Sequence, residues 1–402
     1  MRLPARPFPP PPYAARSASQ CRVAASARSL GRALAFLVPL VGCAPHLRGP
    51  ARSTAVDLDA ESSTSRVHAE VQQALPDVGD GTEVLPPPLR SLFFGTIEDD
   101  APPERGGVTE ARKNKQYLTG NEKSLFAFHA AIAGLGGGYV GVGSDQAYLF
   151  IGWARPQLAW LTDYDPDVVR IHRVHRAFFL AFADPEAFLA AWSKEGTAQA
   201  RAALAAHCDA EELETLERLY FRNRIYIHRR LSALKRSLRR QRLPSYLHDP
   251  DEYLYVRRML EQERIRPMLV NLLDGPGLTG VATASHALNV PIRVLYLSNA
   301  EEYWDRYPDN YRTSIAGLNV DERAVVLRTL LIWDINQDYR YNVQPVRNYQ
   351  DWLTAPFIRN VYDIVHDRPP PLRDAINYFY TDTSPEASPR AKRAGHTVAA
   401  RP

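Results

Sequence analysis

The chain has 402 residues, of which 45% are hydrophobic, and this is enough apolar material for one large folded core. The composition therefore argues against a disordered chain. The formal net charge of +4 does not indicate a nucleic-acid-binding protein, because residues 1–42 carry six arginines and no acidic residue. Without that segment, 43 basic residues face 45 acidic ones, and we expect no nucleic-acid partner.

The N-terminal segment is organised like a bacterial lipoprotein signal peptide. Arginines precede an apolar run from Ala33 to Gly42, which is too short to span a bilayer of about 30 Å but suits the hydrophobic region of a signal peptide. The residues from Leu40 to Cys43 resemble a lipobox, in which small residues before a cysteine permit cleavage once the thiol is acylated. We predict a signal peptide at 1–42, lipidation of Cys43, and a place in the bacterial cell envelope, anchored by lipid on its periplasmic or surface side. The alternative is a buried or free cysteine after an apolar run.

Cys208 is then the one cysteine with no assigned role, so no disulfide framework is expected. It lies in an alanine-rich helical stretch, where a small buried hydrophobic side chain is the usual interpretation.

Two segments have the composition of linkers. Residues 43–85 and 381–402 are rich in small and polar residues with no sustained period, so we predict a disordered tether and a disordered tail. The folded domain is expected over residues 86–380.

Within that domain, apolar periodicity alternates between helix and strand. Asn121 is positioned to cap a helix over residues 122–135, and the glycines at 136–138 end it. The next elements alternate strand, helix, strand and helix, at 139–143, 144–154, 158–163 and 168–182.

A long helical stretch follows at about 185–262, in which Asp209 is a candidate N-cap before an acidic first turn. The alternation then resumes with a strand and loop, a helix and a strand, at 267–277, 278–289 and 291–299. Apolar runs at 323–333 and 341–353 suit the far edge of the sheet. This order predicts a doubly wound, mostly parallel, Rossmann-like α/β sheet, with a helical insertion between the second and third strands.

In such a sheet, ligands bind beyond the carboxyl ends of the strands, at the point where the strand order reverses. The candidate residues follow the four strand ends in turn: Gly141, Gly143, Ser144 and Asp145; Asp163 and Asp165; Asp274, Gly275 and Gly277; Ser298 and Asn299.

The spacing of two of these residues fits a nucleoside. A glycine turn lets backbone N–H groups approach a ligand, and a carboxylate about 20 residues later can accept both ribose hydroxyls. Gly143 and Asp163 have that spacing. A glycine turn also serves any tight connection from strand to helix, so the pattern leaves ligand binding and simple packing both open.

Four segments look, in order, like the strand-end motifs of class I S-adenosylmethionine-dependent methyltransferases: YVGVGSDQAY, LAWLTDYDPDVV, MLVNLLDGPGL and VLYLSNAEEYW. Residues 110–355 also resemble an uncharacterised bacterial group of methyltransferase-like lipoproteins. The resemblance implies roles for these residues: Gly141 and Gly143 against the methionine part of the cofactor, Asp145 at the third loop position, Asp163 on the ribose, Asp274 beside the adenine and Asn299 at the reaction site.

Two departures from that family favour loss of activity. Tyr139 stands where active members usually have an acid, and Asp145 replaces a glycine. Two functions therefore stay open. The first is a non-catalytic envelope protein that binds a small molecule, a glycan or a protein partner. The second is a transferase that uses S-adenosylmethionine or a related nucleoside on an unknown substrate.

Two further patterns carry alternatives. His172 and His175 are neighbours on one helix face, but no third ligand lies nearby, so we predict a polar helix face and no metal site. Residues 222–242 are strongly basic around an apolar stripe. This helix either packs on the core or presents Arg229, Arg236 and Arg240 to anionic lipid.

Overall fold

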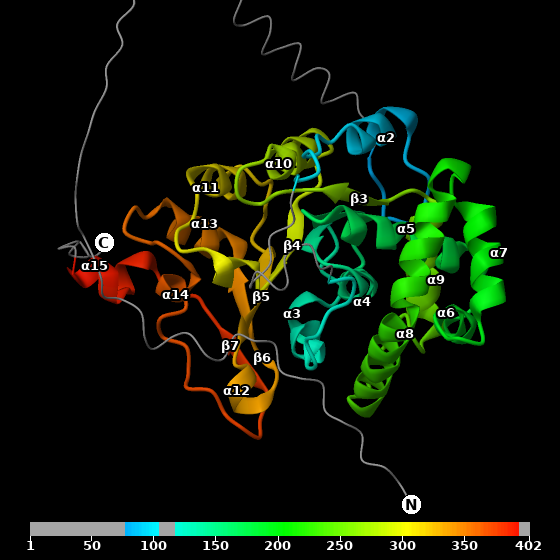
Figure 1. Ribbon diagram of the computed structural model, residues 1–402. Coiled ribbons are helices and arrows are strands. Elements are labelled where there is room, and N and C mark those ends of the chain that lie inside the picture. Colours follow the sequence, from blue (N-terminus) through cyan, green and yellow to red (C-terminus); the bar gives the residue numbers. More distant parts are fainter. Residues whose placement is uncertain (1–76, 104–116, 394–402) are drawn as a thin grey trace, which may run out of the picture. The chain divides into compact units, whose positions relative to one another are not determined.

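The computed structural model describes residues 77–103 and 117–393 (Figure 1). The expected signal peptide, Cys43 and most of the expected tether lie outside these residues. Among the described helices, none is both long enough and apolar enough to cross a membrane.

The centre of the fold is a seven-stranded sheet in the order β3-β2-β1-β4-β5-β6-β7. The strands are β1 Gly138–Val142, β2 Leu158–Asp163, β3 Ile265–Leu269, β4 Ile292–Ser298, β5 Val325–Leu331, β6 Tyr339–Pro345 and β7 Asn377–Tyr380. The first five strands are parallel, β6 is antiparallel to β5, and β7 is parallel to β6. The order reverses between β1 and β4, which makes the carboxyl ends of these two strands the switch point.

Helices cover both faces of the sheet, as Figure 1 shows. They are α2 Pro87–Phe94, α3 His129–Ile132, α4 Asp145–Ala154, α5 Pro166–Ala181, α6 Pro185–Ala191, α7 Thr197–His207, α8 Ala210–Arg240, α9 Pro250–Glu261, α10 Gly277–Ala287, α11 Asp309–Ala316, α12 Trp333–Asn336, α13 Val346–Thr354, α14 Val361–Ile364 and α15 Pro389–Arg393. Helices α4 and α5 pack on one face of the sheet, while α10, α11 and α13 pack together on the other. This α/β, mostly parallel, Rossmann-like architecture confirms the predicted fold class.

Three of these helices begin in the same way. Asp165, Asp184 and Asp249 are the N-caps of α5, α6 and α9, and each carboxylate accepts an N–H from the first turn. A proline occupies the first helical position each time, where a missing N–H costs nothing. The repeated Asp-Pro pair therefore fixes where these helices start.

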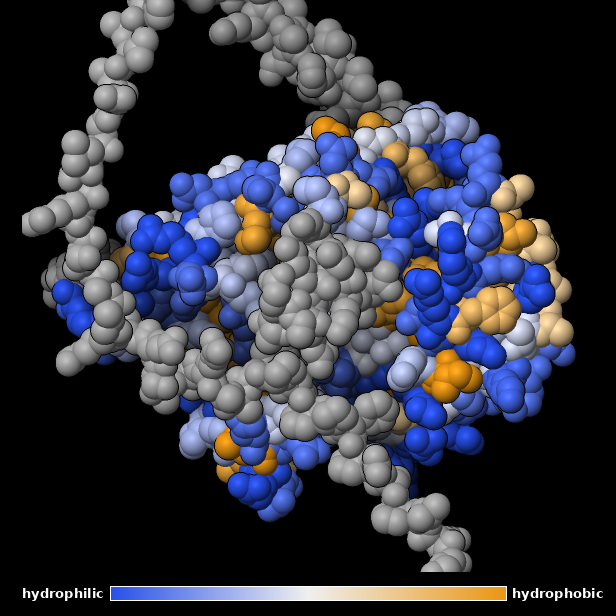
Figure 2. Space-filling model, viewed as in Figure 1, coloured by the Kyte–Doolittle hydropathy of each residue, from blue (hydrophilic) through white to orange (hydrophobic). Residues whose placement is uncertain are grey.

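The helices α6 to α9 lie between α5 and β3, in the stretch expected to be helical. On α8 the apolar stripe is buried, at Ile227, Leu231, Leu234 and Leu238. Asp209 is the N-cap residue of α8, but its side chain caps no N–H group. Figure 2 shows mostly hydrophilic residues where α8 meets solvent, so this helix packs on the core through one face.

Three expected elements differ from the structure. The helix predicted after Asn121 is a 3₁₀ turn, Leu125–Phe128, followed by the short α3, and the Asn121 side chain instead accepts a hydrogen bond from Tyr339. Strand β3 begins at Ile265, two residues before the expected strand and loop, and ends at Leu269. The apolar run at 341–353 is a strand followed by the helix α13, so the edge of the sheet is β7.

The folded domain also extends beyond the boundaries expected from composition, at residues 86 and 380. Val78 and Leu85 are buried, and the Glu83 carbonyl accepts a hydrogen bond from Arg264, so residues 77–85 pack on the domain. At the other end Ser388 is buried, and the Trp352 indole donates to the Thr383 carbonyl. Apolar and hydrogen-bonding contacts therefore hold residues 381–393, where composition alone predicted a disordered tail.

Candidate functional site

Two of the predicted site residues meet at the switch point. Gly143 follows β1 with a φ of +85°, a conformation that favours glycine, and its N–H donates to the Asp163 carboxylate at 3.2 Å. Gly141 lies within β1 rather than in the loop. The 20-residue spacing thus places the glycine turn against the acid at the end of β2.

The Asp163 carboxylate is already bonded to its own loops. One oxygen accepts from Gly143 and the other accepts from the Asp165 N–H at 2.9 Å. Burial raises the pKa of Asp163 to about 7, and the two N–H groups offset part of that shift. A ribose would have to share or replace these contacts.

The Asp145 carboxylate is bonded on both oxygens to other parts of the chain. Its side chain is fully buried, where one oxygen accepts from the Gly120 N–H at 2.7 Å and the other from the Arg230 Nε at 3.1 Å. Burial raises the pKa of this carboxyl, and the facing guanidinium opposes the rise. Asp145 is therefore one half of a buried ion pair that joins α4 to α8.

A short segment lies over the carboxyl ends of the strands. We call Tyr117–Ser124 the covering segment. Its Leu118 carbonyl accepts from Ser144 after β1, and its Glu122 carboxylate accepts from Tyr296 and Ser298 at the end of β4, at 2.8 and 2.7 Å. Further along, the Lys123 and Ser124 amides donate to Asp338 and Tyr341. The segment thus spans from the end of β1, past β4, to β6.

Arg230 binds both the covering segment and the first turn of α4. Besides Asp145, its guanidinium donates to the Glu122 carbonyl at 2.7 Å. Its neighbour Arg229 is exposed, because it lies on the solvent side of α8. Two adjacent arginines of one basic run therefore have opposite environments.

Four buried polar atoms around this segment have no hydrogen-bond partner among the described residues. They are the Tyr139 hydroxyl, Glu122 Oε2, Gln146 Oε1 and Arg230 Nη2. Three of them approach the space beside the Gly120 Cα: a Cβ built there would lie 2.7 Å from Glu122 Oε2, 3.1 Å from Gln146 Oε1 and 3.2 Å from Arg230 Nη2. A bridging water is the usual partner in such a position.

Tyr139 occupies the space beside Gly141. A Cβ on Gly141 would lie 2.2 Å from the Tyr139 hydroxyl, and burial raises the pKa of that hydroxyl. The phenol therefore lies against the strand that was expected to meet the methionine part of a cofactor.

Asp274 and Asn299 form their hydrogen bonds with other partners. Asp274 is exposed and accepts from the Asn271 side chain, five residues beyond the end of β3. Asn299 donates to the Tyr303 hydroxyl at 3.0 Å. The carboxylate that organises the loop after β3 is Asp99, which accepts the N–H groups of Asn271 and Gly277. The structure therefore brings together Gly143 and Asp163, but it joins neither Asp274 nor Asn299 to them.

The histidine pair is buried, which corrects the predicted polar helix face. His172 Nε2 lies 3.0 Å from the Gly143 carbonyl, so it must carry the proton, and Nδ1 then accepts from the Tyr148 hydroxyl at 2.9 Å. Burial lowers the pKa of His172 to about 4. The described residues contain no group of three or more His, Cys, Asp or Glu side chains able to hold a metal ion.

Cys208 is half-buried at the end of α7. Burial raises the pKa of its thiol to about 11, which disfavours the thiolate that a nucleophile needs.

Sequence reasoning missed a second buried ion pair. Arg328 on β5 and Glu301 after β4 are both at most 2% exposed and pair at 2.7 Å. The hydroxyls of Tyr307 and Tyr349 also donate to Glu301. No motif marks these residues, and the ion pair joins positions 27 residues apart in the sequence.

The arginines expected to meet lipid are exposed. Arg229, Arg236 and Arg240 lie on the outer side of α8 and form no ion pair with the described residues. The expected lipid contact stays a prediction, while the buried stripe of α8 supports core packing for its other face.

The parallel sheet and the covering segment together define a Rossmann-like α/β domain. Its switch point is covered by a segment of its own chain. The chain belongs to the DUF7790 family, described as a domain of unknown function, which matches residues 117–371. The matched region begins at the covering segment, which is therefore part of the family domain. A comparison with curated proteins finds no match.

The contribution of the ion pair between Arg230 and Asp145 to stability can be tested by comparing Arg230 with its exposed neighbour Arg229. Arg230→Ala leaves Asp145 buried without a counter-charge, so we expect the free energy of unfolding to fall by about 3–5 kcal/mol. The matched control Arg229→Ala removes an exposed arginine of the same helix and should change it by no more than about 0.5 kcal/mol. Urea denaturation of both variants gives the comparison. Equal, small effects would contradict the buried pair.

Proposed function

We propose that this protein is a lipid-anchored protein of the bacterial envelope whose Rossmann-like domain binds a partner or ligand and catalyses no methyl transfer. The observation that carries the proposal is the covering segment, held over the switch point by Arg230 and Glu122. A cofactor needs that same edge of the sheet, because it is where ligands enter doubly wound folds.

Two further observations support a non-catalytic domain. The Tyr139 phenol fills the space beside Gly141, and the Asp145 carboxylate forms an ion pair with Arg230. Both residues differ from what the methyltransferase resemblance implies at their positions. On this account the resemblance to methyltransferases comes from a similar sheet. The loop after β1, which would hold the cofactor in that family, here packs against the rest of the chain.

One observation favours the second candidate, a transferase that uses S-adenosylmethionine. Gly143 lies against Asp163 at the strand ends, and four buried polar atoms around the covering segment lack partners among the described residues. Unpaired buried polar atoms cost free energy, which a ligand could recover if it displaced the covering segment.

Calorimetric titration of the full chain in detergent with S-adenosylmethionine and S-adenosylhomocysteine separates the two candidates. We expect no binding at millimolar concentration, because the covering segment occupies the site. A micromolar dissociation constant that Asp163→Asn weakens by at least about tenfold would make the transferase the better account. Asp351→Asn is the matched control, since this exposed acid of α13 belongs to neither the switch point nor the residues implied to hold the cofactor.

The lipid anchor rests on the sequence from Ala33 to Cys43 and has its own test. Wild-type protein should partition into the detergent phase, whereas Cys43→Ala should accumulate as an unprocessed precursor. A wild type that stays in the aqueous phase with an intact N-terminus would contradict the anchor.

A further inference from the structure

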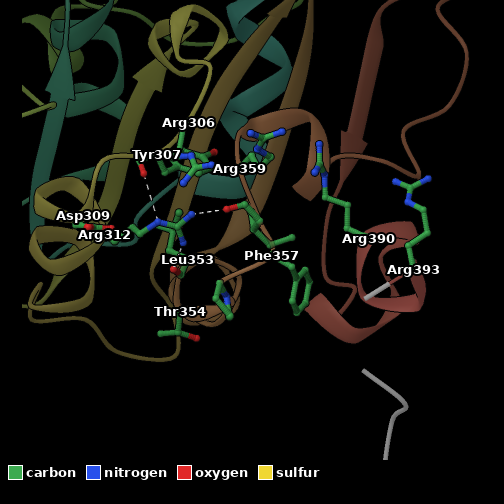
Figure 3. Close-up of a pocket in the computed structure, with 12 residues that line it drawn as sticks. Arg306, Tyr307, Asp309, Arg312, Leu353, Thr354, Phe357, Arg359, Arg390 and Arg393 are labelled. Atoms are coloured by element: carbon green, nitrogen blue, oxygen red, sulfur yellow. Dashed lines mark hydrogen bonds between the residues drawn. The ribbon is translucent and has the colours of Figure 1, made fainter. Parts of the chain in front are cut away.

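A pocket with an arginine-rich lining lies where α11, α13 and α15 meet (Figure 3). Its volume is about 650 Å³, within the range of about 300–1,000 Å³ typical of small-molecule sites. Five of its lining residues are arginines: Arg306, Arg312, Arg359, Arg390 and Arg393. One lining residue, Asp309, is acidic.

Two of these arginines are used by the fold. Arg312 donates to the carbonyls of Leu353 and Ile358, and Arg390 pairs with Asp363. The Asp363 carboxylate also accepts the Arg359 N–H at 2.8 Å, so it has little capacity left for a further cation.

The other three arginines are available to a ligand. The side chains of Arg306, Arg359 and Arg393 are exposed and form no hydrogen bond or ion pair with the described residues. In Figure 3 Arg306 and Arg359 lie beside Tyr307 at one end of the pocket, and Arg390 and Arg393 project from α15 at the other end. Like charges gathered in a concave surface attract an anion, and guanidinium groups match the geometry of phosphate oxygens.

Apolar side chains form another part of the pocket wall. Leu353 and Ile358 are buried in its wall, and Pro356 and Phe357 line it. Tyr307 is held by its hydroxyl bond to Glu301, and the Arg312 guanidinium lies 5.6 Å from the centre of its ring. A preformed wall of this kind lowers the cost of ordering side chains on binding.

We propose that this pocket binds a molecule that carries a phosphate group next to an apolar portion. Arg306, Arg359 and Arg393 hold the phosphate, and the wall around Phe357 contacts the apolar part. Arg390 and Arg393 come from α15, outside the region that the family matches, so the C-terminal segment completes the site. The pocket shares no residue with the switch point, and the proposal therefore stands independently of the proposed function.

The test is calorimetric titration of the full chain, in uncharged detergent micelles, with inorganic pyrophosphate. The variant R306Q/R359Q/R393Q should weaken binding by at least about tenfold, because it removes the charge-assisted hydrogen bonds. The control R229Q/R236Q/R240Q loses the same charge from α8 and should weaken it less than about twofold. Both variants should keep the wild-type unfolding midpoint, since all six side chains are exposed.

Phosphatidylglycerol added to the micelles identifies the source of the phosphate. If it weakens pyrophosphate binding by the wild type, the pocket takes a lipid headgroup. If it has no effect, the pocket takes a soluble organic phosphate, and either result supports the site. Absence of pyrophosphate binding to the wild type, or equal weakening by the two triple variants, would overturn the proposal.

Discussion

The buried pair between Asp145 and Arg230 is the contact on which the rest of the site depends. It fixes the first turn of α4, the middle of α8 and the covering segment in one arrangement, because each of these elements supplies a group to it. A buried charge without its partner is costly, so none of the three elements can leave alone without exposing or stranding an ion. The closed switch point follows from this constraint.

Much of the fold could be predicted from the sequence, since local patterns decide it. The run Leu158 to Asp163 is the strand β2 at the same boundaries, and the spacing between Gly143 and Asp163 does bring the two together. Parallel strands that are buried on both faces are short, continuous apolar runs in the sequence. The sequence therefore indicates their alternation with helices.

The covering segment could not be predicted in the same way. In the sequence Arg230 is one of several arginines in a basic run. The neighbouring residues do not indicate that Arg230 pairs with a buried acid while Arg229 is exposed. Its partner Asp145 is 85 residues away in the sequence. The helix expected after Asn121 is shortened for a related reason: the Lys123 and Ser124 amides donate to Asp338 and Tyr341, so helical structure begins only at Leu125. Contacts between distant residues therefore overrode local propensity at the positions that decide access to the switch point.

The most direct test of the closed switch point is hydrogen exchange at the Gly120 amide, which donates to the buried Asp145 carboxylate. If the covering segment is an integral part of the fold, this amide should exchange as slowly as the amides of β1 and should respond to denaturant as they do, through global unfolding. Rapid exchange at Gly120 while β1 stays protected would show that the segment opens by itself, and would contradict a permanently covered switch point.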